Sequence, residues 1–189
     1  MGIDRPGSEV KRAVFLDRDG VINASVVRDG KPYPPDSVDE MEILPGVAEA
    51  LTALRAAGFE LVVVTNQPDV ARGKQTRAAV EAIHARLSAE LPLDAIYACF
   101  HDDPVGGEGA CDCRKPKPGL LVNAARDRGI DLPSSFMVGD RWRDTDAGVA
   151  AGTRAIFIDR GYSERKPERF AVNVAGLPEA AAWILEQKQ

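Results

Sequence analysis

Three polar side chains that could do chemistry stand at the ends of predicted strands. Asp17 closes a short apolar run, Thr65 closes a β-branched run that begins at residue 59, and Asp140 closes a run that begins at residue 135. In open parallel sheets, ligands bind outside the carboxyl ends of the strands. Strands of one parallel sheet would therefore bring these three groups to a single crevice.

The segment around Asp17 reads FLDRDGVIN, with a second carboxylate at Asp19 and a glycine at position 20. A strand that ends in this way can aim its first carboxylate into a crevice. The alternative for a bare D-x-D-G is an ordinary polar turn after a strand. The segment does not stand alone, however. VTNQ at 64–67 follows the second predicted strand, RKPKPG at 114–119 precedes a predicted helix, and GDRWRDTDAG at 139–148 follows the fourth predicted strand. The alternative for Arg114 and Lys115 within RKPKPG is a solvated basic face.

A separate group of side chains has the spacing of a metal site. Cys99 and His101 are followed, after nine residues, by Cys111 and Cys113. Tetrahedral zinc takes four such ligands, and a structural zinc site keeps no open position. An odd number of cysteines and a start without a secretory signal argue against disulfides. We therefore expect a structural zinc loop over residues 99–113. The alternative is unligated thiols and a surface histidine.

This zinc loop leads directly into RKPKPG. Folding the loop around zinc would set Arg114 and Lys115 at the rim of the crevice. The only other histidine, His84, lies in a predicted helix without ligand neighbours in sequence, and we interpret it as structural.

The elements that must position these groups alternate along the chain. Apolar periodicity predicts strands at 13–16, 59–65, 95–99, 135–140 and 153–159, and helices at 47–58, 76–91, 118–129, 144–152 and from 178 to about 187. Residues 18–42 are polar and rich in Pro, Gly and Asp, which indicates a loop or hairpin. The alternation predicts one α/β domain over residues 1–189: a three-layer Rossmann-like parallel sheet with helices on both faces. No segment between the motifs is long enough for a separate cap domain.

Composition limits the classes of partner. The 189 residues are 44% hydrophobic and 28% charged, which is typical of a globular domain. No apolar run approaches the ~20 residues of a membrane helix, so we expect a cytoplasmic protein without a membrane partner. A net charge of -5 and 6% aromatic residues disfavour a nucleic-acid partner. We expect a monomer that acts on a small molecule.

Taken in order, the four motifs resemble those of the haloacid dehalogenase superfamily of phosphohydrolases, from residue 14 to residue 152. The resemblance implies that Asp17 is the nucleophile, which forms a phospho-aspartyl intermediate. It implies that Asp19 protonates the leaving oxygen and then activates water. Dehalogenases usually lack this second aspartate, so Asp19 favours phosphoryl transfer. Mg²⁺ would bind to Asp17, to the backbone carbonyl of Asp19 and to Asp140.

The same resemblance implies roles for four more residues. The hydroxyl of Thr65 and the backbone N–H of Asn66 would donate to phosphoryl oxygens. Lys115 would neutralise the charge that develops on those oxygens. Asp144 would orient a magnesium-bound water or Lys115. A catalytically silent zinc-bearing binding module is the rival from another class, and the intact set of Asp17, Asp19, Lys115 and Asp140 argues against it.

The C-x-H…C-x-C-R-K-P pattern in a capless chain narrows the resemblance. It resembles the D-glycero-D-manno-heptose 1,7-bisphosphate phosphatases and the related histidinol-phosphate phosphatases, over residues 12–185. The implied reaction converts heptose 1,7-bisphosphate to heptose 1-phosphate, and the alternative substrate is histidinol phosphate or another small ester. Arg114 would help to recognise the substrate.

The chain departs from the family at Pro68-Asp69, where Ser-Gly is usual, and at Phe100, where Pro is usual. The early loop, with Tyr-Pro-Pro at 33–35, departs from the family as well. These departures are expected beside the opening through which the substrate enters. They bear on which substrate is bound and not on the phosphoryl-transfer chemistry.

Overall fold

The computed structural model describes residues 10–103 and 111–187. Its main sheet has six strands in the order β5-β4-β1-β6-β7-β8, and every neighbouring pair is parallel. The strands are β1 (Arg12–Leu16), β4 (Phe59–Asn66), β5 (Ala95–Cys99), β6 (Phe136–Gly139), β7 (Arg154–Ile158) and β8 (Val172–Val174). The chain extends the sheet from β1 to β5 and then returns to the other side of β1 with β6. The carboxyl ends of β4, β1 and β6 are therefore neighbours.

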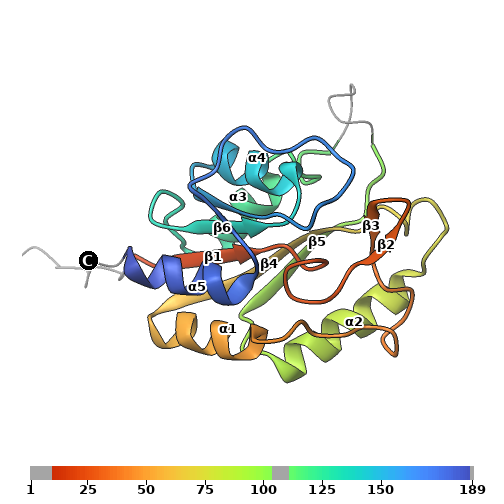
Figure 1. The fold of residues 1–189 in the computed structure, drawn as a ribbon, viewed down its shortest axis with the longest axis horizontal. Helices are drawn as coiled ribbons and strands as arrows, with labels where there is room; N and C mark the ends of the chain where they lie inside the picture. Colours follow the sequence, from red (N-terminus) through yellow and green to blue (C-terminus); the bar gives the residue numbers. More distant parts are fainter. Residues whose placement is uncertain (1–9, 104–110, 188–189) are drawn as a thin grey trace, which may run out of the picture.

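Helices cover both faces of the sheet, which confirms the predicted three-layer α/β class (Figure 1). One face carries α1 (Val47–Ala56), α2 (Arg77–Glu90) and α5 (Leu177–Glu186), and the other carries α3 (Gly119–Arg128) and α4 (Trp142–Ala151). The helix α4 packs on β6 and β7, and α3 packs on β4 and β5. This packing places the first turn of α4 beside the carboxyl end of β6.

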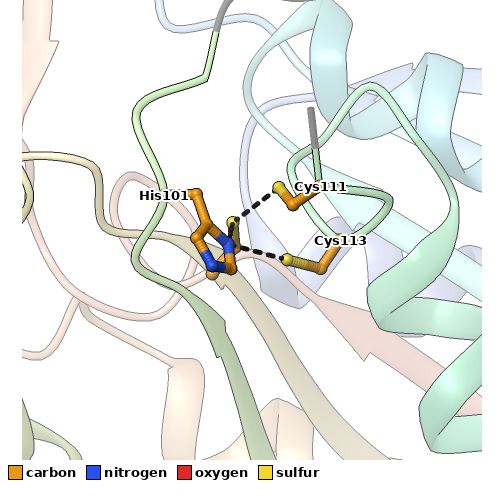
Figure 2. A group of neighbouring side chains, drawn as sticks. His101, Cys111 and Cys113 are labelled. Atoms are coloured by element: carbon orange, nitrogen blue, oxygen red, sulfur yellow. Dashed lines mark hydrogen bonds between the residues drawn. The ribbon is translucent and has the colours of Figure 1, made fainter. Parts of the chain in front are cut away.

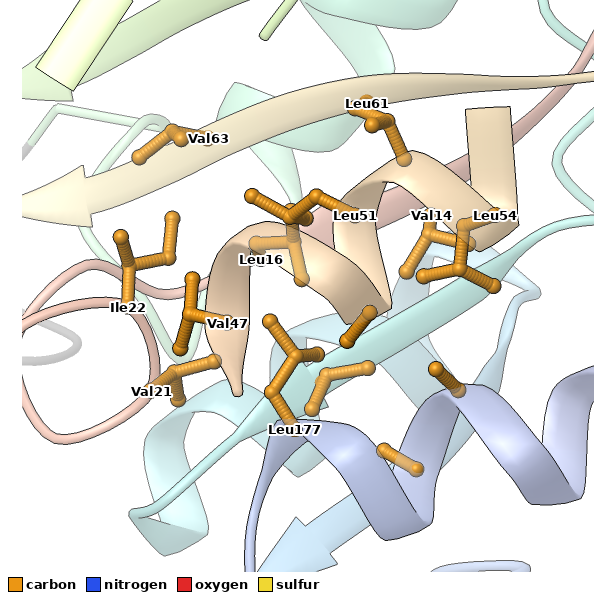
Figure 3. Close-up of a cluster of buried hydrophobic side chains, with 14 of the residues drawn as sticks. Val14, Leu16, Val21, Ile22, Val47, Leu51, Leu54, Leu61, Val63 and Leu177 are labelled. Atoms are coloured by element: carbon orange, nitrogen blue, oxygen red, sulfur yellow. The ribbon is translucent and has the colours of Figure 1, made fainter. Parts of the chain in front are cut away.

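The strands are buried on both faces, and their side chains alternate between two hydrophobic clusters. In β1, Val14 and Leu16 point into the cluster under α1 and α5, whereas Phe15 points into the cluster under α3 and α4. Figure 3 shows the first cluster, in which Leu51 of α1 and Leu177 of α5 lie near the β1 side chains. This two-sided burial explains the continuous apolar runs of the strands, which are typical of parallel sheets.

The structure also refines the predicted elements. The polar segment 18–42 contains a hairpin of β2 (Val26–Arg28) and β3 (Lys31–Tyr33), in line with the predicted loop or hairpin. Asp29 and Gly30 at its turn have φ angles of 51° and 71°, as the tight two-residue hairpin turn requires. The strand β8 was not predicted, because three residues are too short to show a period. The helix α4 begins at Trp142, two residues before its predicted start. None of the described helices combines the length and apolar character needed to cross a membrane.

Candidate active site

Lys115 lies at the centre of the site. Its ammonium donates to Asp17 Oδ1 at 2.8 Å and to the backbone carbonyl of Val64 at 2.8 Å, and it pairs with Asp144 Oδ1 at 2.6 Å. Burial disfavours its charge, but Asp144 and Asp17 outweigh burial and raise the pKa of Lys115 above its ordinary value. Lys115 is only 2% exposed. The expectation that it lies at the rim was therefore wrong, because the carboxylates stabilise the cation below the surface.

Two of the carboxylates that pair with this cation form a buried cluster with a third. Asp17, Asp140 and Asp144 offer oxygen atoms that all lie within 4.8 Å of one another. Burial and then the charge of Asp144 raise the pKa of Asp17 to about 6, against the opposing effect of Lys115. Burial, Asp17 and Asp144 raise the pKa of Asp140 well above its usual range. Asp140 Oδ1 is buried and has no hydrogen-bond partner among the described residues. A bound cation that prefers oxygen ligands would offset the negative charge of these carboxylates, so the site fits Mg²⁺.

Three elements bring these carboxylates together. Asp17 follows β1, and its backbone N–H donates to Val138 O at 2.9 Å, which continues the β1–β6 pairing by one residue. Asp140 follows β6 directly. Asp144 lies in the first turn of α4, where its Oδ2 accepts from the backbone N–H of Arg141 at 2.9 Å. The strand-end positions of Asp17 and Asp140 therefore converge as predicted.

The turn after β1 packs closely against Asp140. Gly20 has a φ of 82°, and a Cβ at this position would lie 1.8 Å from Asp140 Oδ2, so only glycine fits. The same oxygen accepts from the hydroxyl of Tyr162 at 2.7 Å, and Arg160 Nε donates to Gly20 O at 3.0 Å. Sequence reasoning missed Tyr162 and Arg160, since they lie outside every motif and reach the site only through the fold.

A network of donors holds the Asp19 carboxylate. Arg18 donates to both Asp19 oxygens from Nη2 at 3.0 Å, and Asn23 Nδ2 donates to Oδ1 at 2.9 Å. Gln67 Nε2 donates to Asp19 Oδ2 at 3.0 Å and to Thr65 Oγ1 at 2.9 Å. Gln67 therefore links the ends of β1 and β4. The sequence signal for Arg18 was its position between the two aspartates, and Gln67 directly follows the predicted Thr65-Asn66 pair.

Arg18 is fully buried and lies between Asp19 and His84. Its Nη1 is 3.2 Å from His84 Nε2, and because a guanidinium can only donate, the ring nitrogen must accept. Burial and the charge of Arg18 lower the pKa of His84 to about 4. The ring is thus neutral near pH 7, as this hydrogen bond requires. This position agrees with the prediction that His84 is structural, because the ring contacts Arg18, the side chain that holds Asp19.

Thr65 and Asn66 end β4 beside Lys115. Thr65 is buried and lines the cavity, and Gln67 donates both to its hydroxyl and to Asp19. The side chain of Asn66 donates to Lys115 O at 3.0 Å and accepts from Lys115 N at 3.0 Å. This reciprocal pair fixes the backbone of Lys115 to the end of β4. The sequence assigned only the backbone N–H of Asn66 to substrate, so the structural role of its side chain is additional.

Arg114 lies on the cavity wall but is only 8% exposed. Its Nη1 donates to Asp102 Oδ1 at 2.8 Å and to the backbone carbonyls of His101 and Asp103 at 3.2 Å each. Its Nε is buried without a hydrogen-bond partner among the described residues. Arg114 therefore lies deeper than the predicted rim, and its Nε–H is a donor without an acceptor among the described residues.

The predicted zinc ligands come together in space. Cys99 Sγ lies 3.5 Å from His101 Nδ1 and 3.7 Å from Cys111 Sγ, and Cys113 Sγ lies 3.3 Å from His101 Nδ1. Figure 2 shows Cys111, Cys113 and the His101 ring turned toward one another. All three cysteines are free, and burial raises the pKa of the Cys99 and Cys113 thiols. Three thiols and one imidazole within 4.8 Å match the donor set of structural zinc, whose charge would stabilise the thiolates. The predicted loop residues 104–110 lie outside the described residues.

A cavity of about 380 Å³ opens over Asp17. The hairpin contributes Lys31 and Tyr33 to its wall, and the segment after β4 contributes Pro68 and Arg72. In the described part of the chain, no separately folded lid covers it. The volume suits a small molecule.

Comparisons with known proteins agree with this geometry. A family model described as "HAD-hyrolase-like" matches residues 112–182. The D-glycero-β-D-manno-heptose-1,7-bisphosphate 7-phosphatase of Escherichia coli K12 is 38% identical over 92% of this chain and 87% of its own length, and that of Salmonella typhi is 41% identical over 92% and 89%. The crystal structure of D,D-heptose 1,7-bisphosphate phosphatase from B. bronchiseptica, complexed with magnesium and phosphate, aligns over 93% of this chain and 99% of that one, with a TM-score of 0.76 and 33% identity. The chain belongs to the D-glycero-β-D-manno-heptose-1,7-bisphosphate 7-phosphatase family of HAD-like hydrolases.

Proposed function

We propose that the protein is a magnesium-dependent phosphatase that converts D-glycero-D-manno-heptose 1,7-bisphosphate to heptose 1-phosphate. The observation that carries this proposal is the buried cluster of Asp17, Asp140 and Asp144 at the end of a parallel sheet, in which Asp17 and Asp144 pair with Lys115. The activity of the relatives, which are heptose-1,7-bisphosphate 7-phosphatases, supports heptose bisphosphate over histidinol phosphate. The catalytic unit is a single domain over residues 1–189.

In this proposal, Asp17 attacks the phosphorus at C7 and forms a phospho-aspartyl intermediate. Asp17, the backbone carbonyl of Asp19 and Asp140 would hold Mg²⁺, which supplies the positive charge that lets a carboxylate approach an anionic phosphate. Asp19 protonates the leaving sugar oxygen and then takes the proton of the water that hydrolyses the intermediate. Arg18, Asn23 and Gln67 keep its carboxylate in one orientation for both steps.

Cations and polar donors bind the phosphoryl group. Lys115 lies 2.8 Å from Asp17 Oδ1, where its charge can stabilise the oxygens of the phosphoryl group during transfer. The hydroxyl of Thr65 and the backbone N–H of Asn66 would bind other phosphoryl oxygens. Asp144 orients Lys115 through the 2.6 Å ion pair. Zinc held by Cys99, His101, Cys111 and Cys113 would be structural, because four protein ligands leave no open position.

Replacing either aspartate of the first motif should abolish or cripple turnover. Asp17→Asn removes the nucleophile, so no hydrolysis should remain, whereas Asp19→Asn should lower kcat by ~10²–10⁴-fold through the loss of acid–base help. Phosphate release from heptose 1,7-bisphosphate measures both, and Asp39→Asn, an exposed carboxylate outside the cavity, is the control. Near wild-type hydrolysis by purified Asp17→Asn would exclude the covalent mechanism.

Protein purified without added metal should contain one zinc per chain. Cys111→Ser should lose this zinc and melt at a lower temperature, since a structural zinc contributes folding free energy. Elemental analysis and thermal melting measure the two effects. His84→Gln, which changes the histidine outside the cluster, should keep its zinc. Zinc-free wild-type protein, together with an unchanged melting temperature for Cys111→Ser, would refute the zinc site.

Arg114 should govern substrate choice more than chemistry. Its guanidinium can grip a second phosphate or sugar hydroxyls, so Arg114→Ala should lower kcat/KM for heptose 1,7-bisphosphate by about tenfold or more. The loss on p-nitrophenyl phosphate, which offers no second group, should be much smaller. Arg126→Ala, on the outer face of α3, is the matched control. Equal losses on both substrates would instead assign Arg114 to phosphoryl transfer.

A further inference from the structure

Tyr162 contacts the carboxylate cluster of Asp17, Asp140 and Asp144 from outside the cavity. Its hydroxyl donates to Asp140 Oδ2 at 2.7 Å, and it is not among the described residues that line the cavity over Asp17. A phenol keeps its proton near neutral pH, so the hydroxyl is the donor and the carboxylate oxygen is the acceptor. Tyr162 therefore acts on Asp140 and not on the substrate.

The two oxygens of Asp140 lie in different surroundings. Oδ2 accepts from the Tyr162 hydroxyl, and the turn after β1 packs on the same oxygen, because a Cβ at Gly20 would lie 1.8 Å from it and 2.9 Å from the hydroxyl. Oδ1 is buried and has no hydrogen-bond partner in the described part of the chain. A buried acceptor without a donor costs free energy. Oδ1 is therefore the oxygen suited to a cation, while Tyr162 occupies the other one.

The loop that carries Tyr162 is anchored on both sides of it. The loop connects β7 to β8. Before Tyr162, Arg160 Nε donates to Gly20 O at 3.0 Å, and after it, the backbone N–H of Ser163 donates to Gly30 O at 2.8 Å. These contacts fix the phenol through the protein itself. An outer partner that orients a metal ligand needs this kind of support.

A carboxylate with one oxygen engaged in this way offers a single oxygen to a cation. Mg²⁺ demands near-ideal octahedral geometry, to which one oxygen of a carboxylate is suited. Ca²⁺ is larger, takes more oxygen ligands in flexible geometry and can bind both oxygens of one carboxylate. The hydrogen bond from Tyr162 to Asp140 Oδ2 therefore favours Mg²⁺ over Ca²⁺.

We propose that Tyr162 is a positioning residue that makes the site selective for Mg²⁺ over Ca²⁺, because it keeps Asp140 a ligand with one free oxygen. The inference rests on the magnesium site of the proposed function. Tyr162→Phe keeps the ring and removes only the hydroxyl, which frees Oδ2 to join Oδ1 on a cation. Mg²⁺ then loses the support of an outer hydrogen bond, whereas Ca²⁺ gains a second oxygen from the same carboxylate.

The test measures binding of the metal alone. The electron paramagnetic resonance signal of free Mn²⁺ gives the Mn²⁺ affinity of each variant, and then the displacement of Mn²⁺ by Mg²⁺ or by Ca²⁺. Tyr162→Phe should bind Mg²⁺ about 10- to 100-fold more weakly than the wild type, as expected when a metal ligand loses its outer hydrogen bond. Its affinity for Ca²⁺ should fall at least about tenfold less. Asp140→Asn defines the binding that does not involve this carboxylate.

Turnover provides a second measurement. Because Tyr162 acts through the metal ligand, Tyr162→Phe should hydrolyse p-nitrophenyl phosphate slowly at low Mg²⁺ and at nearly the wild-type rate at saturating Mg²⁺. A defect in the substrate-binding cavity would persist at saturating Mg²⁺. Melting temperatures measured without Mg²⁺ show whether the variant is folded.

Tyr97→Phe is the matched control. The Tyr97 hydroxyl also lies beside a carboxylate, 3.4 Å from Asp127 Oδ2, but in an exposed pair away from the cavity over Asp17. This variant should keep the wild-type affinities for both cations. Equal falls in affinity for Mg²⁺ and Ca²⁺ in Tyr162→Phe, or no fall for Mg²⁺, would overturn the inference and leave the proposed function standing. Wild-type protein that binds no divalent cation at Asp140 would instead refute the magnesium site of the proposed function, and this inference with it.

Discussion

The ion pairs of buried Lys115 with Asp17 and Asp144 are the interaction on which the rest of the site depends. Removing one partner of a buried ion pair leaves an unpaired charge and costs ~3–5 kcal/mol. Burial, and after it the charges of the neighbouring carboxylates, raise the pKa of Asp17 and of Asp140. One lysine cannot neutralise three carboxylates. A divalent cation bound there would offset this excess of negative charge.

The surrounding elements are arranged so that these groups can approach closely. A Cβ at Gly139 would lie 2.0 Å from Asp144 Cβ, so glycine at the end of β6 lets α4 bring its carboxylate to Lys115. Asn66 binds the backbone of Lys115, and the zinc-type cluster ends at Cys113, two residues before it. Lys115 is thus fixed from β4 on one side and from the cysteine–histidine cluster on the other. A metal held by that cluster would in this way help to position Lys115.

Much of this arrangement was predictable because it depends on local pattern. Continuous apolar runs predict buried parallel strands, and the residues that end them, Asp17 and Asp140, follow from the rule for parallel sheets. Contacts distant in sequence could not be predicted in the same way. Tyr162 reaches Asp140 from a segment without helix or strand, and His84 meets Arg18 across 66 positions. The depth of Lys115 was missed because a lysine is usually exposed, and only the converging carboxylates make its burial favourable.

The most direct test of the account is detection of a phosphoryl group on Asp17. Enzyme mixed with heptose 1,7-bisphosphate and magnesium, and quenched in acid during turnover, is digested and analysed by mass spectrometry. We predict that the peptide containing Asp17 carries a phosphoryl group that hydroxylamine removes. Turnover by the wild-type enzyme without any such labelled peptide in acid-quenched samples would contradict the central claim.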